Sequence, residues 1–169
     1  MKAAIVGAVV GLLAFVAPDV IGGGESQVES MLVGGHPFAT IATLFAVRLV
    51  LGPLCYAPGL PGGLFAPLLV IGAAAGLLLG TGAESLVPAL KTPLAAFAAV
   101  GMGALFVAVV GAPVTGIALV VEMTGATTLF VPLLTACASA LAVPALLGCR
   151  PIYDTLRDRD AARRERLLQ

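Results

Sequence analysis

An uncharged run from Leu94 to Val121 limits how this chain can fold. A helix crosses the hydrocarbon core of a bilayer with about 20 apolar residues, so this run is too long for one straight span. Gly111-Ala112-Pro113 divides it, and a proline is well tolerated in the first turn of a new helix. The second piece, roughly Val114 to Thr124, is then only about half of a full span. The pattern predicts interrupted helices at membrane depth.

The composition indicates that lipid solvates much of the chain. Hydrophobic residues make up 60% of the 169 positions and charged residues 11%, whereas soluble domains contain about a quarter charged residues. A chain of this length has no core large enough to bury so much apolar surface. We therefore expect an all-α integral membrane protein with several tilted and broken spans, in a plasma membrane or bacterial inner membrane.

The apolar runs and the Gly/Pro breaks between them predict the remaining elements. Met1 to Ile21 is expected to be a retained membrane helix. A cleaved signal peptide is the alternative, but bulky Phe15 stands two residues before the candidate cleavage residue Ala17. The later elements are a short helix at Ser26–Leu32, apolar helices at Phe38–Tyr56 and Leu64–Gly80, a loop at Thr81–Pro93 and a last apolar segment at Thr127–Leu147.

The basic residues gather at the end of the chain. Of nine, six lie between Arg150 and Arg166, interleaved with four acidic residues. This mixture predicts a solvated helical tail on the cytoplasmic side. Because the nine acidic and nine basic residues of the whole chain balance, nucleic-acid binding is not expected.

Two features inside the apolar runs predict packing contacts. Gly72, Gly76 and Gly80 recur at every fourth position, which forms a face on which another helix can pack closely. Arg48 interrupts the run from Phe38 to Tyr56, and an arginine at membrane depth is costly. No acidic residue stands one turn away, so we expect Arg48 to snorkel or to pair with a helix end inside the protein.

Residues that support catalysis or metal binding do not form a recognisable arrangement. His36 is the only histidine, next to Pro37, and an ordinary loop role is expected. The three cysteines, Cys55, Cys137 and Cys149, have no metal or redox spacing and are expected to be small buried hydrophobes. Glu84 and Glu122 are isolated in the sequence. An enzyme, a metal centre and a nucleotide site are therefore not predicted.

An anion site is the chemistry that the sequence does offer. Pro61 to Pro67, a Gly/Pro-rich break, opens directly into an apolar helix, and the N–H groups of a helix start favour negative charge. The amides of Leu64 and Phe65 would bind an anion with partial charges only, which lets a permeating ion leave again. The Tyr153 hydroxyl is a possible second donor. The alternatives are plain helix capping for the first feature and an interfacial anchor for Tyr153.

Several segments resemble, in order and spacing, the CLC family of chloride channels and proton/chloride antiporters. Gly59 to Pro67 (G-L-P-G-G-L-F-A-P) resembles the family's G-x-F-x-P anion motif. Phe97 to Ala104, Ala112 to Gly116 and Val121 to Thr124 resemble later family segments, and Pro151 to Tyr153 resembles the start of its last helix. The resemblance implies chloride transport, by a voltage-gated-channel or exchange mechanism, with chloride bound by Gly63, Leu64, Phe65 and Tyr153 and no cofactor or metal.

The resemblance also implies an architecture and a gap. The family fold is an inverted repeat that assembles as a homodimer, and residues 1–149 match its second transmembrane repeat, with 150–169 as terminal helix and cytoplasmic tail. The family's G-S-G-I-P and G-[KR]-E-G-P segments do not occur in this sequence. We therefore expect one half of a CLC transporter, incompetent alone, whose partner supplies the first repeat. The alternative is a non-transporting assembly subunit or a truncated remnant.

Overall fold

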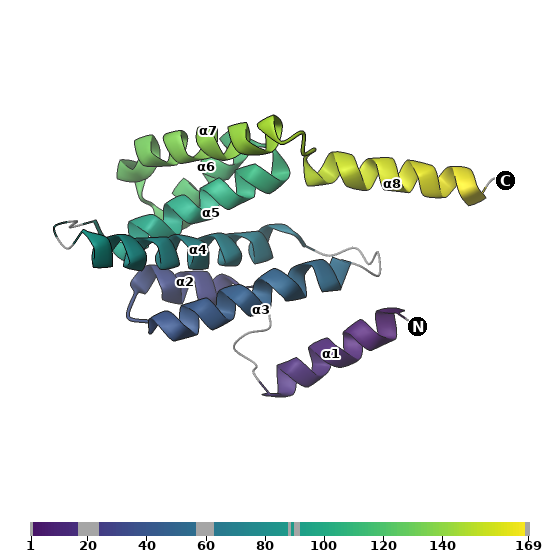
Figure 1. Cartoon of the computed structure of the whole chain (residues 1–169), viewed down its shortest axis with the longest axis horizontal. Helices are drawn as coiled ribbons and strands as arrows, with labels where there is room; N and C mark the ends of the chain where they lie inside the picture. Colours follow the sequence, from purple (N-terminus) through teal and green to yellow (C-terminus); the bar gives the residue numbers. More distant parts are fainter. Residues whose placement is uncertain (1, 17–23, 57–62, 88, 90–91, 168–169) are drawn as a thin grey trace. The chain divides into compact units, whose positions relative to one another are not determined.

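The computed structural model describes residues 2–16, 24–56, 63–87, 89 and 92–167, and this part of the chain contains helices and no strand (Figure 1). The all-α prediction is confirmed. The helices are α1 (Lys2–Val16), α2 (Glu25–Val33), α3 (Phe38–Tyr56), α4 (Phe65–Leu86), α5 (Leu94–Val110), α6 (Pro113–Thr124), the 3₁₀ turn η2 (Thr127–Leu129), α7 (Phe130–Leu146) and α8 (Ile152–Leu167). They form two compact units, Met1–Met102 and Gly103–Gln169, which are described separately.

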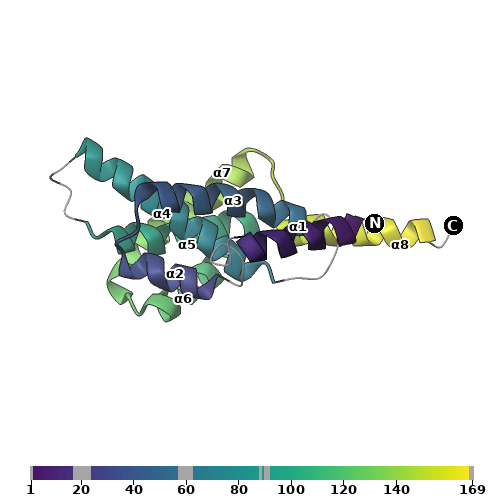
Figure 2. The same cartoon turned by 90° about the horizontal axis from the view of Figure 1, so that it is seen from below.

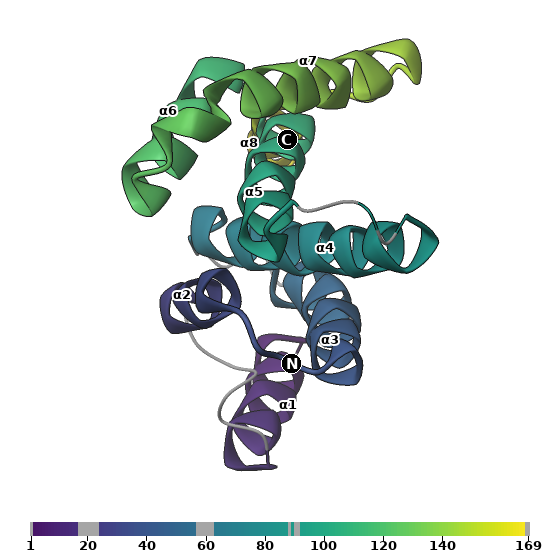
Figure 3. The ribbon, with the colours of Figure 1, turned by 90° about the vertical axis from the view of Figure 1, so that its left-hand side faces the viewer.

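In the first unit, α4 is the helix on which its neighbours pack. Both α2 and α3 pack against it, and they lie along the same side of α4 (Figures 1 and 3). Most of α4 from Leu68 to Leu77 is buried, including Val70, Ala73 and Ala74, which have no exposed surface. This helix therefore supplies the core of its unit.

The glycines of α4 allow the first half of α5 to pack directly on its backbone. A Cβ atom at Gly72 would stand 2.6 Å from the carbonyl oxygen of Gly101, and one at Gly76 would overlap the carbonyl oxygen of Phe97. At Gly80 the Cβ would stand 2.9 Å from the ring of Phe97. The predicted packing face of Gly72, Gly76 and Gly80 is confirmed.

The second unit repeats this use of small residues around α6 and α7, which pack together. A Cβ atom at Gly103 would stand 2.9 Å from Leu133, and one at Gly116 would stand 2.8 Å from Val107. The predicted break between α5 and α6 is confirmed. Gly111 takes a left-handed φ of 78°, which glycine adopts without strain, and Pro113 begins α6. The last helix, α8, follows α7 in the sequence and extends away from α6 and α7 (Figures 1 and 2).

The helix lengths agree with a membrane protein built from full and partial spans. Among the described residues, three helical segments are long and apolar enough to cross a bilayer: Phe38–Cys55, Phe65–Leu86 and Thr127–Leu146. Leu94–Val110 and Pro113–Thr124 are apolar but shorter. Only 11% of the α3 and α7 spans is buried, against 56% of the α4 span. The exposed apolar faces of α3 and α7 are surfaces that lipid or another protein would cover.

Two expectations are wrong. The loop predicted from Thr81 begins later, because α4 continues to Leu86. The hydroxyl of Thr81 donates to the carbonyl of Leu77 at 3.0 Å and that of Ser85 to Gly82 at 2.7 Å, so these polar side chains bond to their own helix rather than ending it. The expectation that all three cysteines are buried is also wrong. Cys137 is buried, but Cys55 is half-buried and Cys149 is exposed.

We predict that Gly76→Ala destabilises the protein, because its methyl group would overlap the backbone of Phe97, which cannot rotate away. Forcing extra atoms into packed helices costs about 1–3 kcal/mol. The melting temperature in detergent, followed by far-UV circular dichroism, should fall. The matched control is Gly82→Ala, also in α4, where a Cβ meets nothing within 4 Å. Equal melting temperatures for the two variants would contradict the packing interpretation.

Candidate anion-binding site

The start of α4 contains three of the four predicted site residues. Leu64 is the N-cap residue, with φ −88° and ψ −26°, and no side chain caps the helix. The carbonyl of Leu64 accepts the first helical bond from the amide of Leu68 at 3.2 Å, so the helix begins at the predicted motif. Pro61 and Gly62, the first part of that motif, lie outside the described residues.

The exposure of these residues leaves the helix start accessible within its own unit. Gly63 is exposed, Leu64 is half-buried and Phe65 is 48% exposed. A Cβ atom at Gly63 would meet nothing within 4 Å. The first-turn amides of an α-helix have no partners within the helix, and the macrodipole adds to their positive potential. This geometry suits an anion.

The first turns of α4 lie against α2. Gly24, the N-cap residue of α2, has φ 96°, and a Cβ there would clash with Cγ2 of Val70 and stand 3.7 Å from the carbonyl oxygen of Ala66. The first turn of α2 therefore touches the first two turns of α4. Val28 and Met31, each 2% exposed, bury the apolar face of the short helix. Sequence reasoning did not find this role of Gly24, because nothing in Gly22-Gly23-Gly24 distinguishes a contact from a loop.

Tyr153 lies in the second unit, as the second residue of α8. Tyr153 is 46% exposed, and no other described residue hydrogen-bonds its hydroxyl. Pro151 fixes the beginning of α8: its carbonyl accepts the amide and the hydroxyl of Thr155, and its ring lies 2.9 Å from where a Cβ of Gly111 would stand. Tyr153 is therefore presented by a helix start whose position is set by the break between α5 and α6.

Arg48 is buried, with 5% of its surface exposed, and it donates a hydrogen bond of 2.6 Å to the side-chain oxygen of Gln27 on α2. The prediction that it pairs inside the protein is confirmed, and the snorkelling alternative is not observed. Its partner is a side chain in the first turn of α2. Sequence reasoning could identify Arg48 from its place in an apolar run, but Gln27 gave no comparable signal.

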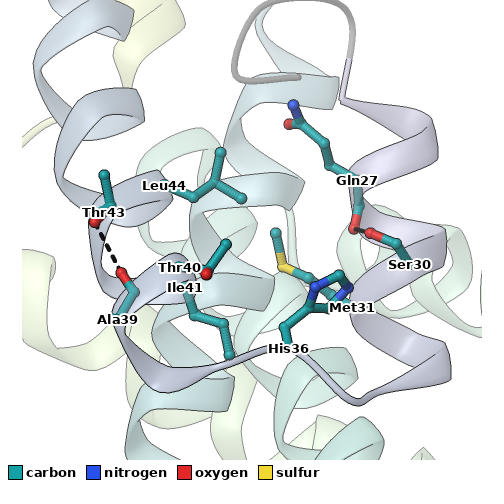
Figure 4. A pocket seen from close by; sticks show the side chains of 9 residues that line it. All are labelled: Gln27, Ser30, Met31, His36, Ala39, Thr40, Ile41, Thr43 and Leu44. Atoms are coloured by element: carbon teal, nitrogen blue, oxygen red, sulfur yellow. Dashed lines mark hydrogen bonds between the residues drawn. The ribbon is translucent and has the colours of Figure 1, made fainter. Parts of the chain in front are cut away.

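A groove of about 430 Å³ lies between α2 and the beginning of α3 (Figure 4). Gln27, Ser30 and Met31 line it from α2, and Thr40 and Leu44 from α3. Much of this lining is apolar, and the groove contains none of the predicted anion-site residues.

The other titratable residues that the sequence singled out are dispersed. His36 is exposed in the turn before α3, at the rim of the groove (Figure 4). Glu122 is exposed and Glu84 is half-buried. In the part of the chain that the structure describes, no three His, Cys, Asp or Glu side chains are placed to hold a metal ion.

Comparison with known proteins agrees with this architecture. Residues 1–145 match the family described as voltage gated chloride channel. The H(+)/Cl(-) exchange transporter ClcA of Vibrio parahaemolyticus is 43% identical over 155 residues, 92% of this chain and 33% of the relative. ClcA of Klebsiella pneumoniae is 37% identical over 161 residues, 95% of this chain and 34% of the relative. The chain thus spans about a third of the length of these relatives.

A solved structure shares the fold. The crystal structure of a slow cyanobacterial Cl⁻/H⁺ antiporter superposes with a TM-score of 0.86 at 34% identity, over 94% of this chain and 37% of the other. The family resemblance read from the motifs is confirmed, as is the integral membrane character of the chain. This protein belongs to the voltage-gated chloride channel (CLC) family.

Proposed function

We propose that this chain forms one wall of a chloride pathway through a membrane, with the start of α4 as the central binding element. The observation that carries the proposal is a helix start without a side-chain cap, at Gly63, Leu64 and Phe65, in a chain of this family. The amides of Leu64 and Phe65 bind chloride, and Gly63 leaves room for it to approach. No cofactor or metal takes part.

Partial charges suit this task. An ion must be bound well enough to lose its hydration shell and weakly enough to leave. Amide groups at the N-terminal end of a helix dipole are equivalent to roughly half an elementary positive charge. This partial charge binds the ion and still lets it leave, whereas the full charge of a lysine or arginine would hold it. Half-helices that point their N-termini at anionic substrates are a recurring solution in transporters.

Tyr153 is the second donor in this proposal. Tyr153 is 46% exposed and its hydroxyl bonds to no other described residue, so it is available to an ion. A phenol adds a directional donor without adding charge. The alternative, an aromatic anchor at the membrane interface, would make the hydroxyl indifferent to chloride.

The facing wall comes from outside these residues. Because the chain matches about a third of its relatives, we propose that it corresponds to the second repeat, 1–149, with the terminal helix and tail, 150–169, on the cytoplasmic side. A first-repeat segment supplies the rest of the pathway. The complete assembly is a homodimer in which each subunit contains one pathway. A plasma membrane or bacterial inner membrane is the proposed location. A non-transporting assembly subunit is the competing function.

Chloride efflux from liposomes tests the one-wall proposal. Vesicles containing only these 169 residues should release chloride little faster than empty vesicles, because half of the ligands are missing. Adding the segment of a ClcA-type relative that this chain does not match should produce selective flux. Robust, selective flux from the chain alone would overturn the proposal, and no flux from the combination would favour the assembly subunit.

Tyr153→Phe tests the second donor. Hydrogen bonds to charged groups contribute about 1.5–3 kcal/mol, so the apparent chloride affinity of the two-part assembly should fall roughly tenfold or more while the melting temperature stays the same. The matched control is Tyr56→Phe, which alters the only other tyrosine of the chain. Unchanged affinity and selectivity in Tyr153→Phe would support the interfacial-anchor alternative instead.

Gly63→Ala tests the approach of the anion to the helix start. Since a Cβ at Gly63 meets nothing within 4 Å, the variant should fold normally and bind chloride more weakly. Gly24→Ala is the contrasting variant: it combines a left-handed φ of 96° with a clash against Val70, so its melting temperature should fall. Isothermal titration with chloride and thermal melting separate the two effects. Wild-type affinity in Gly63→Ala would remove Gly63 from the site.

A further inference from the structure

The contact between Arg48 and Gln27 joins two helices beside the proposed site. Arg48 belongs to α3, inside the apolar span Phe38–Cys55, and is 5% exposed. Its guanidinium donates to the side-chain oxygen of Gln27 at 2.6 Å, across 21 positions of sequence. A buried cation in such surroundings is costly unless it is well hydrogen-bonded. Its position is therefore tightly coupled to that of α2.

The helix that receives this contact has few other means to hold its place. α2 has 9 residues, and its first turn includes Glu25, Ser26 and Gln27. Helices this short are marginal on their own and depend on tertiary contacts. The described contacts of α2 include the apolar packing of Val28 and Met31, the approach of Gly24 to Val70 and the hydrogen bond from Arg48.

The same turn of α2 also reaches α4. Gly24 touches Val70 and approaches the carbonyl of Ala66, which directly follows Phe65. Gln27 and Gly24 stand three positions apart, so a shift of Gln27 moves Gly24 with it. A continuous set of contacts thus runs from Arg48 through the first turn of α2 to the first turns of α4.

We propose that Arg48 is a positioning residue for anion binding: through Gln27 it holds α2 against the first turns of α4 and so fixes the direction of the Leu64 and Phe65 amides. The inference rests on the proposed function, since it assigns a task relative to that site. Arg48 does not contact the ion. Small displacements matter here because the donors of a binding site act only within a narrow range of distance and angle.

The test is a double-mutant cycle read by chloride affinity. Arg48→Met and Gln27→Leu are measured singly and together in the two-part assembly in nanodiscs, from the rise of melting temperature with chloride concentration. Each single variant should weaken chloride binding by about twofold to thirtyfold, the range found for residues that modulate binding without touching the ligand. The double variant should lose less than the sum of the two single losses, because both single variants remove the contact between Arg48 and Gln27.

Two further variants separate positioning from general destabilisation. Leu133→Ala removes a fully buried side chain in the second unit and should lower the melting temperature at zero chloride without altering chloride affinity. Thr43→Val, on α3, removes an exposed hydroxyl that bonds only within its own helix and should alter neither quantity. If Arg48→Met does not fold, Arg48→Lys, which keeps the charge but not the planar fork, takes its place with the same expected weakening.

The outcomes distinguish this inference from the function on which it rests. If the wild-type assembly shows no chloride-dependent stabilisation, the proposed function fails. If the wild type responds to chloride and the Arg48 and Gln27 variants bind it with wild-type affinity, the positioning role fails alone. Additive losses in the double variant would also overturn it, because they would mean that the two residues act separately.

Discussion

The structure depends on one constraint: backbone polar groups cannot face lipid without a hydrogen-bonding partner. A helix that begins at membrane depth exposes its first amides unless protein or an aqueous path encloses them, and α4 begins at Leu64 without a side-chain cap. The first unit meets part of this requirement by burying α4 among α2, α3 and the first half of α5. In the proposed function the same constraint makes the start of α4 useful, since a helix start that lipid cannot satisfy favours an anion.

Close backbone packing is what makes such enclosure possible with so few large side chains. Gly72 and Gly76 let α4 and α5 approach until carbonyl oxygens stand where Cβ atoms would be. Helices in lipid gain little from apolar burial against each other, so packing and polar contacts must hold them together. The spans α3 and α7 are largely exposed, so they contrast with the packed face of α4. Their outward faces need only match the bilayer or a neighbouring protein.

Sequence reasoning succeeded where a single residue type has one physical consequence. Pro113 and Gly111 marked the break between α5 and α6, and the glycines of α4 marked its packing face. It failed to predict the end of α4, because polar side chains can bond either to solvent or to their own helix. Thr81 and Ser85 bond to carbonyls of α4, and the helix continues past them. It also missed Gln27, since the partner of a buried cation 21 positions away leaves no local pattern in the sequence. For Leu64, Phe65 and Tyr153 the sequence predicted roles, and the structure gives their local geometry.

The Arg48–Gln27 contact shows why a costly residue can persist in an apolar helix. Replacing a buried polar pair by well-packed hydrophobic residues is often neutral or stabilising, so stability alone gives little reason to keep an arginine in α3. A hydrogen bond differs from apolar contact in fixing direction as well as distance. Apolar burial of Val28 and Met31 holds α2 without a preferred direction, whereas the bond from Arg48 to Gln27 adds a directional contact. In the proposed anion site, where partial charges bind the ion, a defined position of α2 is worth more than the stability that Arg48 costs.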